Sequence, residues 1–191
     1  GIEELDTASA TMVVKAGTPL EECQRAAADA GLFLALDLGS RGSCTIGGNL
    51  STNAGGIRVI RYGMAREQVL GLEAVLADGT TVSSMNRMLK NNAGYDLKQL
   101  FIGSEGTLGV ITRAVLRLHP PTGEIATTLC AVESYEKVVS LLRAAQSSLG
   151  GIVAFEAMWR GIRAVQPGAH LGDIGSTIQK FAEGHGCSIV R

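Results

Sequence analysis

Glycine gathers in one stretch of this 191-residue chain, and that stretch limits most strongly what the chain can fold into. Between residues 39 and 63 neither a helical nor a strand period of apolar residues survives, so the sequence predicts a long and mostly irregular segment. A loop of that length inside a compact domain is usually functional or disordered, and the interleaved serine, threonine and asparagine residues favour an ordered loop. The glycines of this segment are Gly39, Gly42, Gly47, Gly48, Gly55, Gly56 and Gly63.

Regular structure is predicted on the amino-terminal side of this segment. Residues 11–15 predict a short strand, and residues 32–38 predict a strand or an extended chain. Between them a helix is predicted from residue 18 to about residue 30, with a threonine cap, a proline at the first helical position, a capping-box glutamate and a glycine stop. These four residues are Thr18, Pro19, Glu21 and Gly31.

The carboxyl-terminal side predicts a hairpin and a further strand. Residues 69–77 alternate as a strand does, and a tight turn at residues 78–79 leads into a return strand. One helical turn within residues 95–101 and a second glycine-rich turn at residues 103–109 precede a strand over residues 110–118. The side chains of that last strand that are expected to face inwards are Ala114, Leu116 and Leu118.

A pair of prolines, Pro120 and Pro121, ends this strand and indicates a domain boundary. Beyond it the pattern predicts a second, smaller module. Its expected elements are a strand over residues 126–132, a helix over residues 134–149 capped by Ser134, a strand over residues 152–158 and a helix over residues 173–183.

Charge and cysteine usage exclude several classes of protein. The formal net charge of −1 excludes a generally basic nucleic-acid binder, and no apolar run approaches the roughly 18 residues that span a bilayer. The four cysteines form no CxxC pair and, with the three histidines, no metal-binding cluster. The acidic amino terminus is unlike a secretory signal. We therefore expect no metal, no nucleic acid, no membrane and a cytoplasmic location; the oligomeric state is not indicated.

The glycine-rich segment is open to two interpretations when its residues are considered alone. Dense glycine lets main-chain N–H groups approach a phosphate or the polar edge of a planar ring, which would make a ligand cradle. It also suits a packing loop that binds nothing. The segment matches neither GxxxxGK[ST] nor GxGxxG, so it is neither a P-loop nor a Rossmann turn. The nearby Arg58, Arg61 and Arg66 are likewise either ligand contacts or a solvated face.

A series of motifs over roughly residues 10–158 resembles the FAD-linked oxidases of the vanillyl-alcohol oxidase type. Within these enzymes the chain is most similar to the D-2-hydroxyglutarate and D-lactate dehydrogenases and the glycolate oxidase flavoprotein subunit. The order and the spacing of the motifs both match. They are Asp37-Leu-Gly-Ser40, the run from Ser43 to Gly56, Arg61-Tyr-Gly63, Val69 to Glu73, Leu76 to Gly79, Gly94-Tyr-Asp-Leu97 and Gly103 to Gly109.

The resemblance implies an α+β fold. Residues 1–122 would be the second subdomain of a two-subdomain FAD-binding domain, and residues 123–160 would begin an α+β cap that is followed by a C-terminal helix. FAD would be the cofactor and a small 2-hydroxy acid the substrate, oxidised to a 2-oxo acid by hydride transfer to flavin N5. The residues implied to line the cofactor are Gly47, Gly48, Asn49, Thr52, Asn53, Gly55 and Gly56, with Tyr62, Gly63, Glu105, Gly109 and Ile111 as further contacts.

The resemblance carries over no catalytic residue. The loop that holds the FAD pyrophosphate in such enzymes lies upstream of this sequence, and their substrate-binding arginines and metal site lie downstream of it. We therefore expect an incomplete enzyme, and a truncated or fused fragment without flavin is the alternative. Residues 161–191 resemble an internal segment of methionine aminopeptidase, but one without its metal ligands, so peptidase activity is not expected.

Overall fold

A computed structural model describes residues 1–128, residue 130 and residues 134–155 of the chain. It divides into two compact units, one over Gly1–Ile125 and a second that begins at Ala126. The first unit contains both glycine-rich segments.

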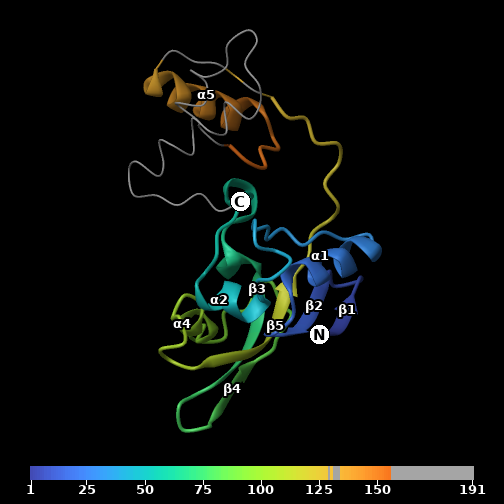
Figure 1. Cartoon of the computed structure of the whole chain (residues 1–191), viewed down its shortest axis with the longest axis vertical. Coiled ribbons are helices and arrows are strands. Elements are labelled where there is room, and N and C mark those ends of the chain that lie inside the picture. Colours follow the sequence, from blue (N-terminus) through green and yellow to red (C-terminus); the bar gives the residue numbers. More distant parts are fainter. Residues whose placement is uncertain (129, 131–133, 156–191) are drawn as a thin grey trace. The chain divides into compact units, whose positions relative to one another are not determined.

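One antiparallel sheet organises the first unit (Figure 1). Within residues 1–125 five strands pair in the order β1-β2-β5-β3-β4, so the last strand in sequence, β5, lies at the centre. Residue Ala114 of β5 is opposite Val14 on one side and Leu72 on the other. The strands are β1 (Ile2–Asp6), β2 (Thr11–Lys15), β3 (Val69–Val75), β4 (Thr81–Ser84) and β5 (Val110–Arg117).

The first face of the sheet packs against helices α1 (Leu20–Asp29) and α2 (Ile46–Ser51) (Figure 1). Burying a leucine or isoleucine side chain stabilises the fold by about 1.5–3 kcal/mol, and these helices bury several. Burial also raises the pKa of the Cys23 thiol in α1 to about 12, so it stays protonated. The fully buried side chains of this face include Met12, Val14, Leu20, Ile46, Leu50 and Ala114.

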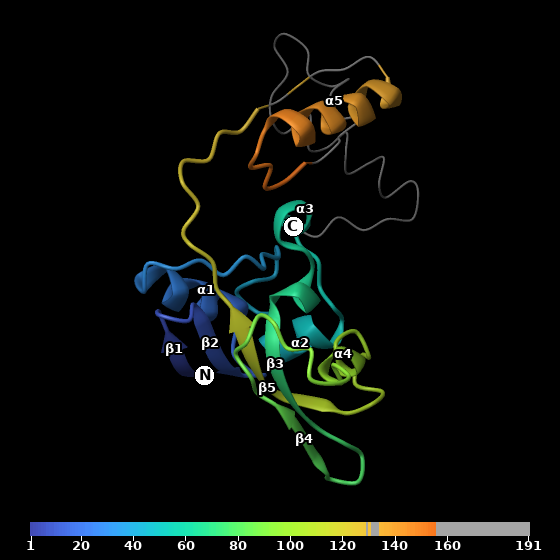
Figure 2. The same ribbon diagram turned by 180° about the vertical axis from the view of Figure 1, so that it is seen from behind.

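The second face is covered by a short irregular segment that we call the strap, residues 85–87, which follows β4 directly (Figure 2). Met85 packs over Val13, Leu70 and Val115 on this face. The strap passes so close to β3 that a Cβ at Gly71 would lie 2.8 Å from the Met85 Cα. Strand β3 is therefore covered on both faces, and its first four residues are all buried rather than alternating.

Helix α1 begins differently from the prediction. Thr18 does not cap it, because the Thr18 hydroxyl donates to the Lys15 carbonyl at 2.7 Å and the helix starts at Leu20. The first helical N–H groups instead donate to carbonyls of the glycine-rich segment, from Leu20 to Cys44 and from Glu21 to Arg41, both at 3.0 Å. The predicted capping box is wrong because tertiary contacts satisfy these donors. The predicted stop is confirmed, since Gly31 has a φ of 71°.

Most of the other predicted elements are confirmed. Strands β2, β3, β4 and β5 and the helical turn α4 (Lys98–Phe101) lie where the sequence predicts them, and Ala114, Leu116 and Leu118 are buried. Strand β1 was not predicted, because Glu3 and Glu4 interrupt its apolar pattern. Two further short helices, α3 (Val59–Tyr62) and the 3-10 helix η1 (Ala65–Gln68), lie between α2 and β3.

In the second unit, helix α5 (Tyr135–Ser148) is confirmed, and the Ser134 hydroxyl caps it by accepting from the Lys137 N–H at 3.4 Å. The two flanking strands are not found in their described parts, which are residues 126–128 and 130 for the first and residues 152–155 for the second. The predicted helix at residues 173–183 lies outside the described residues.

Candidate functional site

The short helix α2 forms inside the segment that the sequence predicts to be irregular. The hydroxyl oxygen of Thr45, directly before it, accepts from the Gly48 N–H at 3.4 Å. Gly47 is buried at the end of β2, and its N–H donates to the Ala16 carbonyl at 2.7 Å. The prediction is wrong here because these contacts support a helix that each glycine disfavours by about 1 kcal/mol.

The main-chain amides of α2 and of the residues after it are mostly used within the protein. The N–H groups of Asn49, Thr52, Asn53 and Ala54 donate to carbonyls of residues 45–50. A continuous row of bare amides from residue 45 to residue 56, which the cradle interpretation requires, is therefore absent. Among the described residues of this row, the N–H groups of Gly55 and Gly56 have no hydrogen-bond acceptor.

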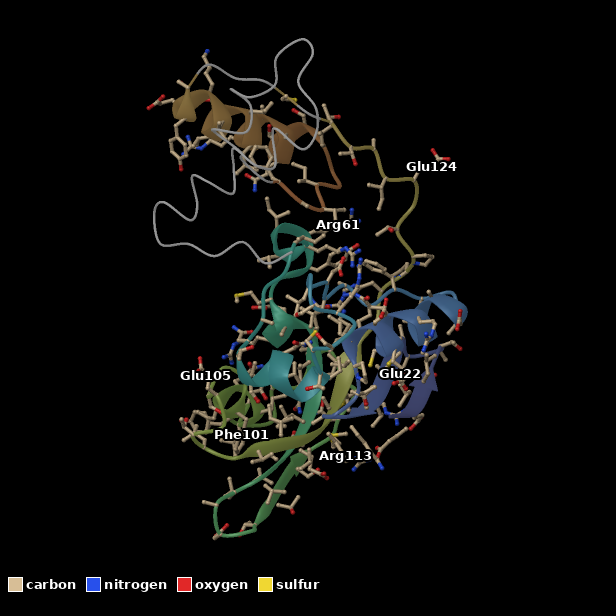
Figure 3. The ribbon with its side chains drawn as sticks, in the orientation of Figure 1. Glu22, Arg61, Phe101, Glu105, Arg113 and Glu124 are labelled. Carbon is tan, nitrogen blue, oxygen red and sulfur yellow. The ribbon has the colours of Figure 1, made fainter. Side chains whose placement is uncertain are left out.

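The second glycine-rich turn packs directly against the end of α2. The Gly103 N–H donates to the Leu50 carbonyl at 3.0 Å, and the Glu105 N–H donates to the Ser51 carbonyl at 2.9 Å. Glu105 has a left-handed φ of 51°, and its exposed side chain lies at the outer edge of the turn beside α2 and α4 (Figure 3). The two glycine-rich segments, distant in sequence, thus lie side by side.

Arg66 joins the loop after α2 to the second turn. Its main-chain N–H donates to the Asn53 side-chain oxygen at 3.0 Å. Its guanidinium donates to the Gln99 carbonyl at 2.8 Å, to the Gln99 side-chain oxygen at 2.7 Å and to the Ile102 carbonyl. One arginine therefore links η1, the loop at Asn53 and the end of α4.

Asp37 holds the same loop from its other side. This carboxylate is 5% exposed and forms ion pairs with Arg58 and Arg41, each at 3.0 Å. The loop approaches so closely that a Cβ at Gly56, where φ is +83°, would lie 2.0 Å from the Asp37 carbonyl oxygen. Arg58 also lies over the Phe33 ring, 4.8 Å from its centroid. Arg58 and Arg66 thus hold the loop in place by contacts within the protein. The sequence suggested either ligand contacts or a solvated face for them, and neither describes this role.

A cluster of rings supports the end of α3. The Tyr62 ring lies 4.8 Å from the His119 ring and 5.7 Å from the Phe33 ring, between centroids. The buried Gln68 side chain donates to the Tyr62 carbonyl and lies 3.0 Å from the His119 Nε2. Sequence reasoning missed Gln68 and His119, because no local pattern indicates a pair that lies 51 residues apart.

These contacts define what we call the glycine surface, residues 52–56, 62–64 and 103–106. The Ala65 N–H donates to the Ala54 carbonyl at 2.8 Å, which joins its first two parts, and Arg66 joins the third. Its outer end carries α3 and Arg61, whose guanidinium lies 5.3 Å from the Tyr62 ring centroid (Figure 3).

The structure distributes the predicted cofactor residues unevenly over this region. Gly47 and Asn49 are buried inside the unit, and the Asn49 amide contacts the Cys44 sulfur at 3.4 Å. Ile111 is 5% exposed within β5, and Gly109 precedes that strand. Gly48 is exposed on α2. The predicted residues that meet on the glycine surface are Thr52, Asn53, Gly55, Gly56, Tyr62, Gly63 and Glu105.

A metal site and a membrane-spanning helix are two further possibilities for the described part of the chain. No group of three or more histidine, cysteine, aspartate or glutamate side chains there is placed to hold a metal ion. No helix among the described residues combines the length and the apolar character needed to cross a membrane.

Comparison with known proteins connects this region to flavin binding. A family model described as an FAD binding domain matches residues 1–84. D-2-hydroxyglutarate dehydrogenase from Bos taurus is 47% identical over 151 residues, which are 78% of this chain and 28% of that protein. The enzyme of the same name from Xanthomonas citri pv. viticola is 46% identical over 146 residues, 76% of this chain and 31% of that protein. The chain thus spans about a third or less of these relatives.

A solved structure supports the same fold. Alkyldihydroxyacetonephosphate synthase matches with a TM-score of 0.55 and 30% identity over 63% of this chain and 21% of that chain. The resemblance of residues 161–191 to methionine aminopeptidase is not borne out by the comparisons, and those residues lie outside the described part of the chain.

The residues of the glycine surface fit a flavin dinucleotide. FAD presents phosphate oxygens and the polar edge of a tricyclic ring, which need N–H donors on a backbone without obstructing side chains. Gly55 and Gly56 offer such donors, and the Asp37 and Arg66 contacts hold them in a defined position. The fit to FAD thus depends on the two N–H groups of Gly55 and Gly56, rather than on the longer row of amides that the sequence suggested.

Proposed function

We propose that this chain, which carries the FAD-binding domain of an FAD-linked oxidase of the vanillyl-alcohol oxidase type, is the flavin-holding part of a dehydrogenase that oxidises a D-2-hydroxy acid to a 2-oxo acid. The observation that supports this most directly is the 47% identity over 151 residues to a D-2-hydroxyglutarate dehydrogenase. Since relatives of that name recur, D-2-hydroxyglutarate is the substrate to test first.

The glycine surface would hold FAD through a small number of main-chain donors. The N–H groups of Gly55 and Gly56 would bind its oxygens, and the Thr52 hydroxyl and the Asn53 side chain would border it. Gly47, Gly48 and Asn49 would act by shaping α2, while Glu105, Gly109 and Ile111 remain proposed contacts from the second turn and β5. Bound FAD supplies the acceptor for the hydride that leaves the substrate α-carbon.

Binding of FAD to the purified chain tests the first part of the proposal. The chain is titrated with FAD, and quenching of flavin fluorescence is followed together with visible circular dichroism of the flavin. We expect saturable binding with induced circular dichroism, and weaker binding of riboflavin, which lacks the pyrophosphate and the adenosine. A folded chain with no induced signal at millimolar FAD would favour the alternative of a fragment that binds no flavin.

The activity is tested on the protein as the source organism makes it. Addition of D-2-hydroxyglutarate without oxygen should bleach the bound flavin near 450 nm, and the L enantiomer should not. Equal bleaching by both enantiomers, or bleaching by neither, would contradict the proposed substrate class while leaving FAD binding in place.

A further inference from the structure

Gln68 is a buried polar side chain whose orientation is determined by its partners. It is 2% exposed, and its amide nitrogen donates to the Tyr62 carbonyl. The nitrogen must face Tyr62, because a carbonyl oxygen only accepts hydrogen bonds. The Gln68 oxygen therefore faces the His119 Nε2 at 3.0 Å, and that nitrogen must carry a proton. A chain of hydrogen bonds thus runs from His119 through Gln68 to Tyr62.

His119 is held in place through both its main chain and its ring. Its main chain pairs with Phe33 through two hydrogen bonds of 2.8 Å, just beyond the end of β5. Its ring contacts the Tyr62 ring at a centroid distance of 4.8 Å. The His119 side chain therefore links the central strand of the sheet to the end of α3, where the Tyr62–Gly63 corner belongs to the glycine surface.

The charges around this histidine oppose its protonation. Arg117 faces it from β5 and Arg61 faces it from α3, and its hydrogen-bonding partner Gln68 is uncharged. Arg58, which lies over Phe33, is paired with Asp37. Burial lowers the pKa of His119, and the positive charges of Arg117 and Arg61 lower it further. The imidazole is thus neutral in the folded protein at neutral pH.

We propose that His119 is a positioning residue of the FAD-binding surface, which acts through Gln68 to hold the Tyr62–Gly63 corner and makes FAD affinity depend on pH. This inference rests on the proposed function. Protonation would add a third positive charge beside Arg61 and Arg117. The charged ring would move towards water, and the hydrogen-bonded chain to Tyr62 would break.

The direction of the pH effect follows from the lowered pKa. Below the ordinary histidine pKa of 6.5, His119 is protonated in the unfolded or opened state but stays neutral in the closed state, where its pKa is lower. Acid therefore favours opening of the Tyr62–Gly63 corner. FAD affinity is therefore expected to be constant above pH 7 and to fall as the pH is lowered from 6.5.

Two variants of His119 separate the hydrogen bond from the charge. His119→Gln keeps an N–H donor at a similar reach and cannot be protonated, whereas His119→Leu removes the donor. The matched control is His170→Gln, which removes a histidine elsewhere in the chain. The Kd for FAD is measured at pH 7.5 and pH 5.5. At the same two pH values, hydrogen exchange measures protection of the Gly63 amide, which donates to the Val59 carbonyl at 2.9 Å.

We expect the Kd of the wild type and of His170→Gln to rise at least fivefold between pH 7.5 and pH 5.5, with a parallel loss of Gly63 protection. His119→Gln should keep the wild-type Kd of pH 7.5 at both values, and His119→Leu should bind FAD at least fivefold more weakly already at pH 7.5. An unchanged pH dependence in His119→Gln would overturn the inference. If the wild type binds no FAD at pH 7.5, the proposed function fails, and Gly63 protection alone then decides for or against the role of His119.

Discussion

The loop of the glycine surface and the strap are both irregular segments held by charged side chains, but they are held in different surroundings. The loop is tied to Asp37, whose side chain is 6% exposed, and to Arg66, which donates to main-chain carbonyls. The strap is tied by Arg87 to Glu4 and Asp6, whose side chains are 33% or more exposed. Because water screens exposed ion pairs, similar contacts should fix the loop firmly and the strap only weakly.

The largest effect is expected where the loop meets Asp37. Gly56→Ala places a methyl group 2.0 Å from the main-chain oxygen of Asp37, so the backbone has to shift, and it does so at a φ of +83°. Gly79→Ala is the matched control, because Gly79 has a φ of +85° and open space around it. In urea unfolding we expect a loss of about 1 kcal/mol for the control and about 3–4 kcal/mol for Gly56→Ala. Equal losses of unfolding free energy in the two variants would show that the loop at Gly56 is held as weakly as the strap.

The second effect concerns the buried charge itself. Asp37→Ala leaves Arg58, which is 21% exposed, without its carboxylate partner and should cost about 3 kcal/mol in the free energy of unfolding. The double variant Asp37→Leu with Arg58→Met removes both charges of the Asp37–Arg58 pair. It should recover most of that loss, because Arg41, the other partner of Asp37, is 51% exposed and stays hydrated. Additive losses in the double variant would mean that the pair does not hold the loop.

The smallest effect is expected in the strap. Arg87 lowers the pKa of Glu4 by hydrogen bonding to it, so this contact contributes stability above the ordinary glutamate pKa, and acid removes it as the pH falls through the lowered value. Because both groups are exposed, Arg87→Ala should change the thermal midpoint less than either loop variant, and high salt should abolish the difference. A loss in the thermal midpoint of Arg87→Ala that persists in 1 M salt would show that the strap is held as firmly as the loop.

Local patterns were sufficient to predict much of the sheet. Strands β2, β3 and β5 are short apolar runs next to turn residues. Ser134 indicates the start of α5, because a capping residue acts within one turn of its own helix. Strand β1 was missed, since its Glu3 and Glu4 side chains find their partners Arg113 and Arg87 far away in the sequence.

The site was predicted less well than the sheet, for a physical reason. The motifs single out these glycine-rich turns as proposed cofactor contacts, but the number of their free amides depends on tertiary contacts. Helix α2 is supported by the Ala16 and Thr18 carbonyls, which lie just after β2. Its main-chain N–H groups form hydrogen bonds within the protein, which the sequence alone does not indicate. The hydrogen bonds from Arg66 to Gln99 and from His119 to Gln68 join residues that are 33 and 51 positions apart, and no periodic pattern in the sequence indicates such pairs.

The central claim is that the unpaired amides of the glycine surface bind FAD. Two-dimensional nitrogen–proton NMR of the chain, recorded while FAD is added, tests it directly, because each amide reports on itself. We predict that the Gly55 and Gly56 resonances shift progressively and saturate, while Gly79, which lies in the β3–β4 turn, stays in place. Saturable binding of FAD that shifts other amides and leaves Gly55 and Gly56 unchanged would contradict the claim.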